Sequence, residues 1–291
     1  MERRNFLKLA LAGAGAASLT AATGCGLTGG AAASGDKTIK IIATESAPYQ
    51  EPTKIAAELL KAKGWTLEAT YVTDIIQPNL AVSNGEFDAN YFQHGAYLQQ
   101  FNVDQKLEVQ PLFYVYGSPA GIWSERYSSL QELPDGARIA LPVDPANNGR
   151  GLVLLRDAGL LELKDGVGVI HTSQESITAN PKNFEFVEVD QQSLSKTLPD
   201  VDAGVLFVRL AAEIGLSPDD ALAFEAEADQ VPFRCVVAGT AEFADSEKAK
   251  VLQEAYQSPE VREWFAGYMG GVLPTPWDAD PLEELDSWWQ A

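Results

Sequence analysis

Residues 85–94, Gly-Glu-Phe-Asp-Ala-Asn-Tyr-Phe-Gln-His, indicate the fold most clearly. The apolar run at 87–92 predicts a strand that leads directly into a helix over 95–101. A matching segment, Val-Asp-Ala-Gly-Val-Leu at 201–206, precedes a second predicted helix near 209–214. Both units place an x-Asp-Ala strand between a turn and a helix, so we interpret them as equivalent parts of two similar lobes.

The remaining pattern supports two α/β lobes. Short apolar runs alternate with amphipathic segments from residue 37 onward, as in layered α/β proteins. Ligands of open α/β sheets bind beyond the carboxyl ends of the strands, so residues 93–95 and 207–209 are candidate ligand contacts. We expect two chain crossings, near 114–118 and 228–234. The predicted domains are lobe 1, residues 37–116 plus 233–291, and lobe 2, residues 117–232.

The N-terminus has the features of an export signal. Arg3 and Arg4 precede Phe-Leu-Lys and an uncharged run over 9–22, which is too short for a membrane-spanning helix. The arginine pair also resembles a twin-arginine signal, with an ordinary secretory signal as the alternative. Small residues before Cys25 resemble a lipoprotein processing site, at which the sulfur receives a diacylglycerol. We therefore predict a signal peptide over 1–24 and a lipidated Cys25 with a flexible tether over 25–36.

Charge and cysteine content exclude several classes of protein. The net charge of −20 disfavours nucleic acid and anionic lipid head groups as partners. If Cys25 is lipidated, Cys235 is the only cysteine left, so no disulfide within the mature chain can form. Because Cys235 lies in a short apolar run, we expect a buried and inert thiol.

The segment 144–151, Asp-Pro-Ala-Asn-Asn-Gly-Arg-Gly, precedes an apolar helix predicted over 152–158. A helix start presents unpaired N–H groups and partial positive charge, and Arg150 could add a bidentate clamp on a carboxylate. The alternative is structural: Asn147 only caps the helix, and Arg150 pairs with an acidic side chain on the surface.

Catalytic patterns are sparse. The two histidines, His94 and His171, have no zinc-like spacing, and neither a nucleophile elbow nor a phosphate-binding loop occurs. Glu86 and Asp88 could serve as acid and base, but Asp88 is better explained as fixing the start of a strand. The sequence therefore favours a binding protein over an enzyme, with no cofactor or metal.

The chain resembles the NlpA-type lipoproteins, the methionine-binding proteins of ABC importers. The resemblance rests on Gln77-Pro78-Asn79-Leu80-Ala81, on 85–94 with Tyr97-Leu98, and on Asp144-Pro145 with Asn147 and Gly149-Arg150. It implies a two-lobed periplasmic-binding-protein-like fold of type II, with a cleft between the lobes. It also implies a monomer that closes on a zwitterionic amino acid and delivers it to a membrane permease and its ATPase.

The resemblance also implies roles for particular residues. Arg150 would hold the carboxylate of the ligand, Asn147 would be a polar contact, and an aromatic wall would enclose the side chain. That wall would consist of Tyr91, Phe92, His94 and Tyr97. The chain differs from the family where Asn-Gly-Asn is usual and Phe207-Val208-Arg209 stands, and at Tyr49, where His is common. These positions indicate a more apolar pocket, in which Arg209 either reads an acidic group or faces solvent.

Three hypotheses about ligand and role follow. The first is methionine or a related apolar amino acid. The second is a different small carboxylate or a short peptide. The third is a sensing module that reports ligand occupancy to a membrane receptor.

Overall fold

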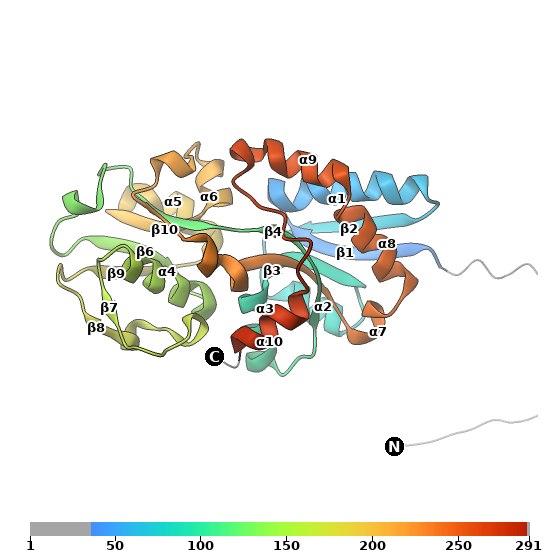
Figure 1. Ribbon diagram of the computed structural model, residues 1–291, viewed down its shortest axis with the longest axis horizontal. Coiled ribbons are helices and arrows are strands. Elements are labelled where there is room, and N and C mark those ends of the chain that lie inside the picture. The colour runs from blue at the N-terminus through green and yellow to red at the C-terminus, as the bar shows by residue number, and fades with distance from the viewer. Residues whose placement is uncertain (1–35, 290–291) are drawn as a thin grey trace, which may run out of the picture. The chain divides into compact units, whose positions relative to one another are not determined.

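The computed structural model describes residues 36–289, whose strands form two five-stranded sheets, called sheet A and sheet B here (Figure 1). Sheet A has the order β2 (Thr66–Val72), β1 (Thr38–Thr44), β3 (Ala89–His94), β12 (Arg234–Gly239), β4 (Gln110–Gly117). Sheet B has the order β9 (Glu185–Val189), β6 (Arg138–Pro142), β10 (Ala203–Phe207), β5 (Ala120–Trp123), β11 (Ala223–Phe224). A third, two-stranded sheet pairs β7 (Glu162–Leu163) with β8 (Ile177–Ala179).

The two large sheets share one topology. In sheet A, β1 is parallel to β2 and β3, whereas β12 is antiparallel to β3 and β4. In sheet B, β6 is parallel to β9 and β10, whereas β5 is antiparallel to β10 and β11. The strands β3 and β10 therefore occupy equivalent positions, which confirms the prediction made from the two x-Asp-Ala segments.

The repeated aspartates fix the starts of these strands. The Asp88 carboxylate accepts a hydrogen bond from the Lys40 backbone N–H at 2.7 Å, and the Asp88 N–H donates to the Lys40 carbonyl at 2.9 Å. Asp202 makes the same two bonds to Arg138, at 2.8 and 2.9 Å. In each case the carboxylate satisfies a donor at the start of the neighbouring strand and sets the register of the pair. The structural explanation of Asp88 is thereby confirmed.

Helices cover both faces of the sheets (Figure 1). Their bounds are α1 (Ala47–Ala62), α2 (Gln77–Ser83), α3 (Gly95–Gln105), α4 (Pro145–Asp157), α5 (Leu194–Thr197), α6 (Val208–Glu213), α7 (Ala241–Ala244), α8 (Glu247–Tyr256), α9 (Pro259–Gly267) and α10 (Pro281–Trp289).

Helix α1 begins at Ala47, because Pro48 supplies the fixed φ that suits a first turn, and Pro52 lies inside the helix. The helix expected over 152–158 begins at Pro145. Asp144 is its N-cap and accepts the Asn147 N–H at 3.0 Å, an Asp-Pro start that the sequence does contain.

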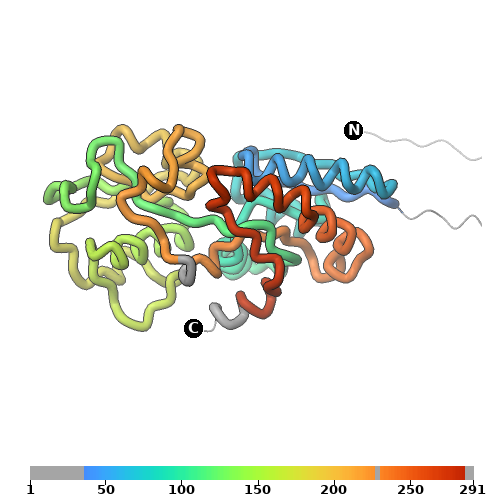
Figure 2. Tube along the Cα trace, turned by 45° about the horizontal axis from the view of Figure 1, so that its top comes forward, coloured from blue at the N-terminus to red at the C-terminus, as the bar shows by residue number. Residues whose placement is uncertain are grey.

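The chain passes from sheet A to sheet B between β4 and β5 and returns between β11 and β12 (Figure 2). Residues 37–289 form one compact unit by their contacts. The lobe boundaries at 116/117 and 232/233 remain predictions.

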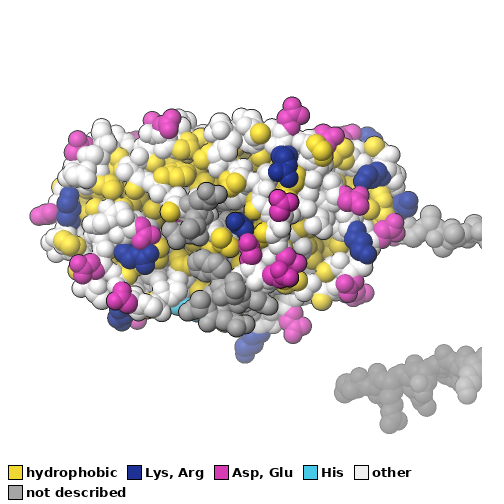
Figure 3. Space-filling model, in the orientation of Figure 1, with side chains coloured by type: hydrophobic (Ala, Val, Ile, Leu, Met, Phe, Trp, Pro, Cys, Tyr) yellow, Lys and Arg dark blue, Asp and Glu magenta, His cyan; other side chains and the backbone are white. Residues whose placement is uncertain are grey.

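The predicted signal peptide (1–24), Cys25 and all but the last residue of the predicted tether (25–36) lie outside the described residues. Within residues 36–289, no helix combines the length and apolar composition needed to cross a bilayer. Acidic side chains are scattered over the face shown in Figure 3, where no basic cluster forms.

Candidate ligand-binding site

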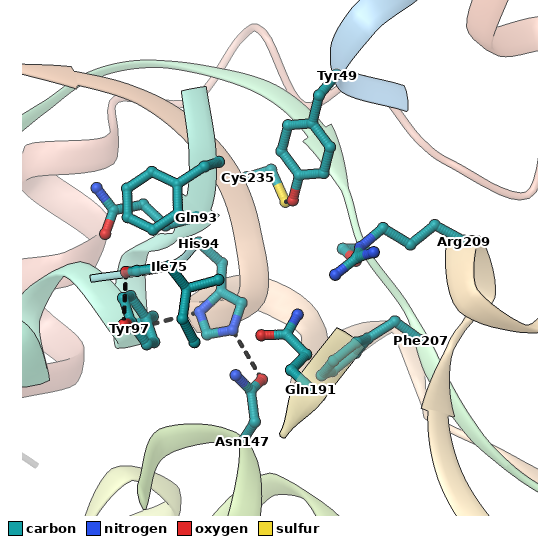
Figure 4. A pocket seen from close by; sticks show the side chains of 12 residues that line it. Tyr49, Ile75, Gln93, His94, Tyr97, Asn147, Gln191, Phe207, Arg209 and Cys235 are labelled. Atoms are coloured by element: carbon teal, nitrogen blue, oxygen red, sulfur yellow. Dashed lines mark hydrogen bonds between the residues drawn. The ribbon is translucent and has the colours of Figure 1, made fainter. Parts of the chain in front are cut away.

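A pocket with about 340 Å³ of empty space lies between elements of the two sheets (Figure 4). The carboxyl ends of β3 and β10 both contribute to the pocket, as predicted for residues 93–95 and 207–209. The lining residues are Tyr49, Ile75, Phe92, Gln93, His94, Tyr97, Ser118, Asn147, Gln191, Phe207, Arg209 and Cys235.

A hydrogen-bond chain joins the two sides of the pocket. His94, at the end of β3, places Nε2 2.8 Å from Oδ1 of Asn147 on α4. The other ring nitrogen, Nδ1, accepts the Tyr97 backbone N–H at 3.1 Å, and the Asn147 amide donates to the Asp144 carboxylate at 2.9 Å. These roles are compatible only with a neutral His94 that donates from Nε2.

The surroundings of His94 keep the ring neutral. Burial, and then the positive charge of Arg150, lower the pKa of His94 to about 3, against a smaller opposing effect of the Asn147 hydrogen bond. At neutral pH the residue therefore adds polarity but no charge to the pocket.

Aromatic rings form much of the wall, and two of them are held by polar contacts. The Tyr97 hydroxyl donates to the Ile75 carbonyl at 2.8 Å, and the Phe92 and Tyr97 rings meet edge to face at 5.9 Å. The Tyr49 hydroxyl lies 3.4 Å from Sγ of Cys235. These contacts fix the rings before a ligand arrives, which suits the enclosure of an apolar side chain.

Tyr91 does not line the pocket, unlike its predicted partners in the aromatic wall. The Tyr91 side chain is fully buried instead. Its ring packs against Tyr49 at 4.8 Å, and its hydroxyl donates to the Pro48 carbonyl at 2.9 Å. Tyr91 therefore packs against Tyr49, which lines the pocket, without lining the pocket itself.

Arg150 also lies outside the lining, and its guanidinium has an internal partner. Nε donates to Glu225 at 2.8 Å and Nη2 donates to the other carboxylate oxygen at 2.5 Å. Nη2 also donates to the Ser118 carbonyl at 2.6 Å. The guanidinium expected to hold the ligand carboxylate is thus paired with a carboxylate of the chain. This carboxylate is buried, whereas the structural alternative expected a surface acid, and Asp144 rather than Asn147 caps the helix. Glu225 is 75 residues away, so no local sequence signal could reveal it.

Arg209 is the one Lys or Arg among the residues that line the pocket. Its side chain is 3% exposed, and Nη1 lies 3.3 Å from Oε1 of Gln192 and 3.9 Å from the half-exposed carboxylate of Glu213. Figure 4 shows its guanidinium directed toward the space between Tyr49 and Phe207. Of the two sequence interpretations of Arg209, the structure supports a residue that faces the cleft.

Gln93 lies in the predicted range 93–95, whereas sequence reasoning did not select four other lining residues as ligand contacts. Gln93 is held in a buried amide network with Asn79 and Asn90. Cys235 is buried and uncharged, since burial raises the pKa of its thiol, as expected. Its place in the wall follows from the pairing of β12 with β3, a long-range contact. The other three are Ile75, Ser118 and Gln191.

The acid and base candidates show no catalytic arrangement. Asp88 lies at the opposite end of β3 from His94 and bonds to the backbone, and Glu86 is exposed. Among the side chains that the structure describes, no three His, Cys, Asp or Glu gather as a metal site would require.

Comparison with known proteins shows the family to which this chain belongs. The profile of the NlpA lipoprotein family matches residues 39–275. The chain belongs to this family. It is 36% identical over 257 residues to the methionine-binding lipoprotein MetQ of Bacillus subtilis, covering 86% of this chain and 92% of that protein. It is also 36% identical over 217 residues to the D-methionine-binding lipoprotein MetQ of Salmonella typhimurium. That alignment covers 74% of this chain and 79% of that protein.

Solved structures of similar binding proteins share the fold. A nutrient-binding protein from Burkholderia cenocepacia, solved bound to methionine, aligns with a TM-score of 0.77 at 32% identity. The alignment covers 82% of this chain and 99% of that one. The two-lobed periplasmic-binding-protein-like fold expected from the sequence is thereby confirmed.

Proposed function

We propose that this protein is the extracytoplasmic ligand-binding lipoprotein of an ABC importer and that it captures methionine or a related apolar amino acid. The observation that carries the proposal is the pocket between the two sheets, which combines an aromatic wall with one inward-facing cation in a chain related to methionine-binding lipoproteins. The ligand would contact the predicted residues that line it: Tyr49, Phe92, His94, Tyr97, Asn147, Phe207 and Arg209.

The two lobes would close around the ligand. A ligand shifts an open–closed balance only through contacts that differ between the two states, and here such contacts come from both sheets. Phe92 and His94 belong to sheet A, whereas Asn147 and Phe207 belong to the sheet B side. The lobe division at 116/117 and 232/233 is part of this proposal.

The location follows from the N-terminal sequence together with the family. Cys25 would carry the lipid anchor after removal of residues 1–24, and residues 25–36 would act as the tether. The monomeric lipoprotein would then deliver its ligand to a permease driven by an ATPase. The twin-arginine route remains a prediction.

A thermal-shift screen tests the function. The panel contains free amino acids, both methionine enantiomers, short peptides and small carboxylates. A ligand at 100 times its Kd stabilises by about 2.7 kcal/mol, which is a shift of roughly 5–10 °C for a protein of this size. We expect the shift with methionine or a similar apolar amino acid, and none with lysine or glutamate. If no amino acid moves the transition, the proposal is wrong.

A further inference from the structure

Two buried arginines contact the ring of Phe207, but one alone faces the ligand space. The guanidinium carbon of Arg150 lies 5.4 Å from the ring centroid and that of Arg209 lies 6.0 Å from it. Phe207 and Arg209 line the pocket, whereas Arg150 does not. The Phe207 ring therefore covers Arg150 on the ligand side.

Glu225 neutralises the covered arginine. The two side chains are 1% and 5% exposed and form a two-pronged ion pair. Glu225 also accepts the Ala120 backbone N–H at 3.2 Å, and the Phe233 ring packs 3.9 Å from the Arg150 guanidinium. A ligand carboxylate at Arg150 would meet a like charge that is already buried there, which is unfavourable in a water-poor site.

Arg209 has no comparable partner. Its nearest carboxylate is 3.9 Å away and half exposed, and the ring of Tyr49 lies 5.9 Å from its guanidinium carbon. None of the twelve lining residues is Asp or Glu, and His94 is neutral, so the pocket carries one positive charge. A buried cation in such a pocket is best satisfied by an anion from the ligand.

We propose that Glu225 and Phe207 are specificity determinants that withdraw Arg150 from the ligand, so that Arg209 binds its acid group. This deepens the proposed function and rests on it for the location of the ligand. The ligand class is a monocarboxylate with an apolar chain. Because the lining offers no carboxylate to an ammonium group, the acid group dominates recognition and a carboxylate that lacks the ammonium also binds.

Calorimetric titration of the full chain tests the inference with three probes. These are L-methionine, 4-(methylthio)butanoate, which lacks the ammonium, and L-methioninamide, which lacks the carboxylate. The wild type should bind the first two and not the third. Arg209→Gln should weaken binding of both carboxylates by about 10- to 100-fold, the usual effect of losing a charged hydrogen-bond donor. Arg209→Lys should have an affinity between those of the wild type and Arg209→Gln, because lysine keeps the positive charge but lacks the paired N–H donors of the guanidinium.

Two further variants separate Arg209 from a general loss of charge. Arg150→Gln/Glu225→Gln removes the neutralised pair together and should bind about as well as the wild type. The matched control is Arg126→Gln, because Arg126 pairs with Asp202 and does not line the pocket. If the melting curve shows that the double variant does not fold, the affinities of Arg209→Gln and Arg126→Gln for the two carboxylates are compared instead, and only Arg209→Gln should bind them more weakly.

The outcomes distinguish the inference from the function. Binding of methionine that survives Arg209→Gln overturns the inference and leaves the function intact. Binding of 4-(methylthio)butanoate but not methionine, lost in Arg209→Gln, supports the inference and contradicts an amino-acid carrier. A wild type that binds neither carboxylate overturns the inference as well.

Discussion

At the scale of single residues, the pocket depends on the charge state of His94. A neutral ring accepts from the Tyr97 N–H and donates to Asn147, whereas a protonated ring would lose the first of these bonds. The sequence placed His94 and Arg209 just after predicted strands and so among the candidate ligand contacts, whereas Asn147 was a candidate contact through the family resemblance. It could not predict that Glu225 pairs with Arg150, since the two residues are 75 positions apart in the sequence.

Acid should destabilise the protein through His94. The folded-state pKa of about 3 lies below the ordinary value of 6.5, so the unfolded chain binds one more proton between these values. The contribution is therefore fully present above pH 6.5 and is lost progressively as the pH falls toward 3. Between pH 6.5 and 5 the wild type should lose about 2 kcal/mol that His94→Gln does not lose. Denaturant unfolding at a series of pH values measures the difference, and parallel pH profiles would contradict the assignment.

At the scale of elements, close packing of α4 positions Asn147. A Cβ added at Gly149 would lie 2.3 Å from the Val169 carbonyl oxygen and 2.6 Å from that of Thr172, and both are backbone atoms that cannot rotate away. The strands predicted at 87–92 and 201–206 and the helices predicted near 95–101 and 209–214 lie close to β3, β10, α3 and α6. Sequence reasoning misplaced the start of α4 because an Asp-Pro helix start was read as a loop.

Gly149→Ala should therefore destabilise the protein by about 1–3 kcal/mol, the usual range for overpacking a rigid site. Gly267→Ala is the matched control, because an added Cβ at that helix position meets nothing within 4 Å. Urea unfolding of both variants against the wild type measures the effect. Equal stability of the two variants would show that α4 can shift to admit the methyl group.

At the scale of the whole molecule, the two sheets are joined by two chain crossings and bridged by the His94–Asn147 bond. The repeated x-Asp-Ala segments predicted two similar halves, because an aspartate that fixes a strand start leaves a local signature. The way in which the halves meet depends on contacts between distant segments, such as His94 with Asn147 and Ser46 with Glu213, and these leave no local pattern.

Breaking the bridge should open the pocket. Asn147→Leu removes the acceptor for His94, at a cost of about 1–3 kcal/mol, so the open form should become roughly 10- to 100-fold more populated. Cys235 is buried in the pocket wall, so its alkylation by N-ethylmaleimide reports opening. We expect faster labelling of Asn147→Leu than of the wild type. Gln253→Leu on α8 is the control, and equal labelling rates would show that the bond does not hold the lobes together.

The most direct test of the central claim is a crystal structure of the protein grown with L-methionine. The account predicts methionine in the pocket between Tyr49, Phe92 and Phe207, with its carboxylate on Arg209 and the Arg150–Glu225 pair intact. Methionine bound elsewhere, or a carboxylate on Arg150 with Glu225 displaced, would contradict it.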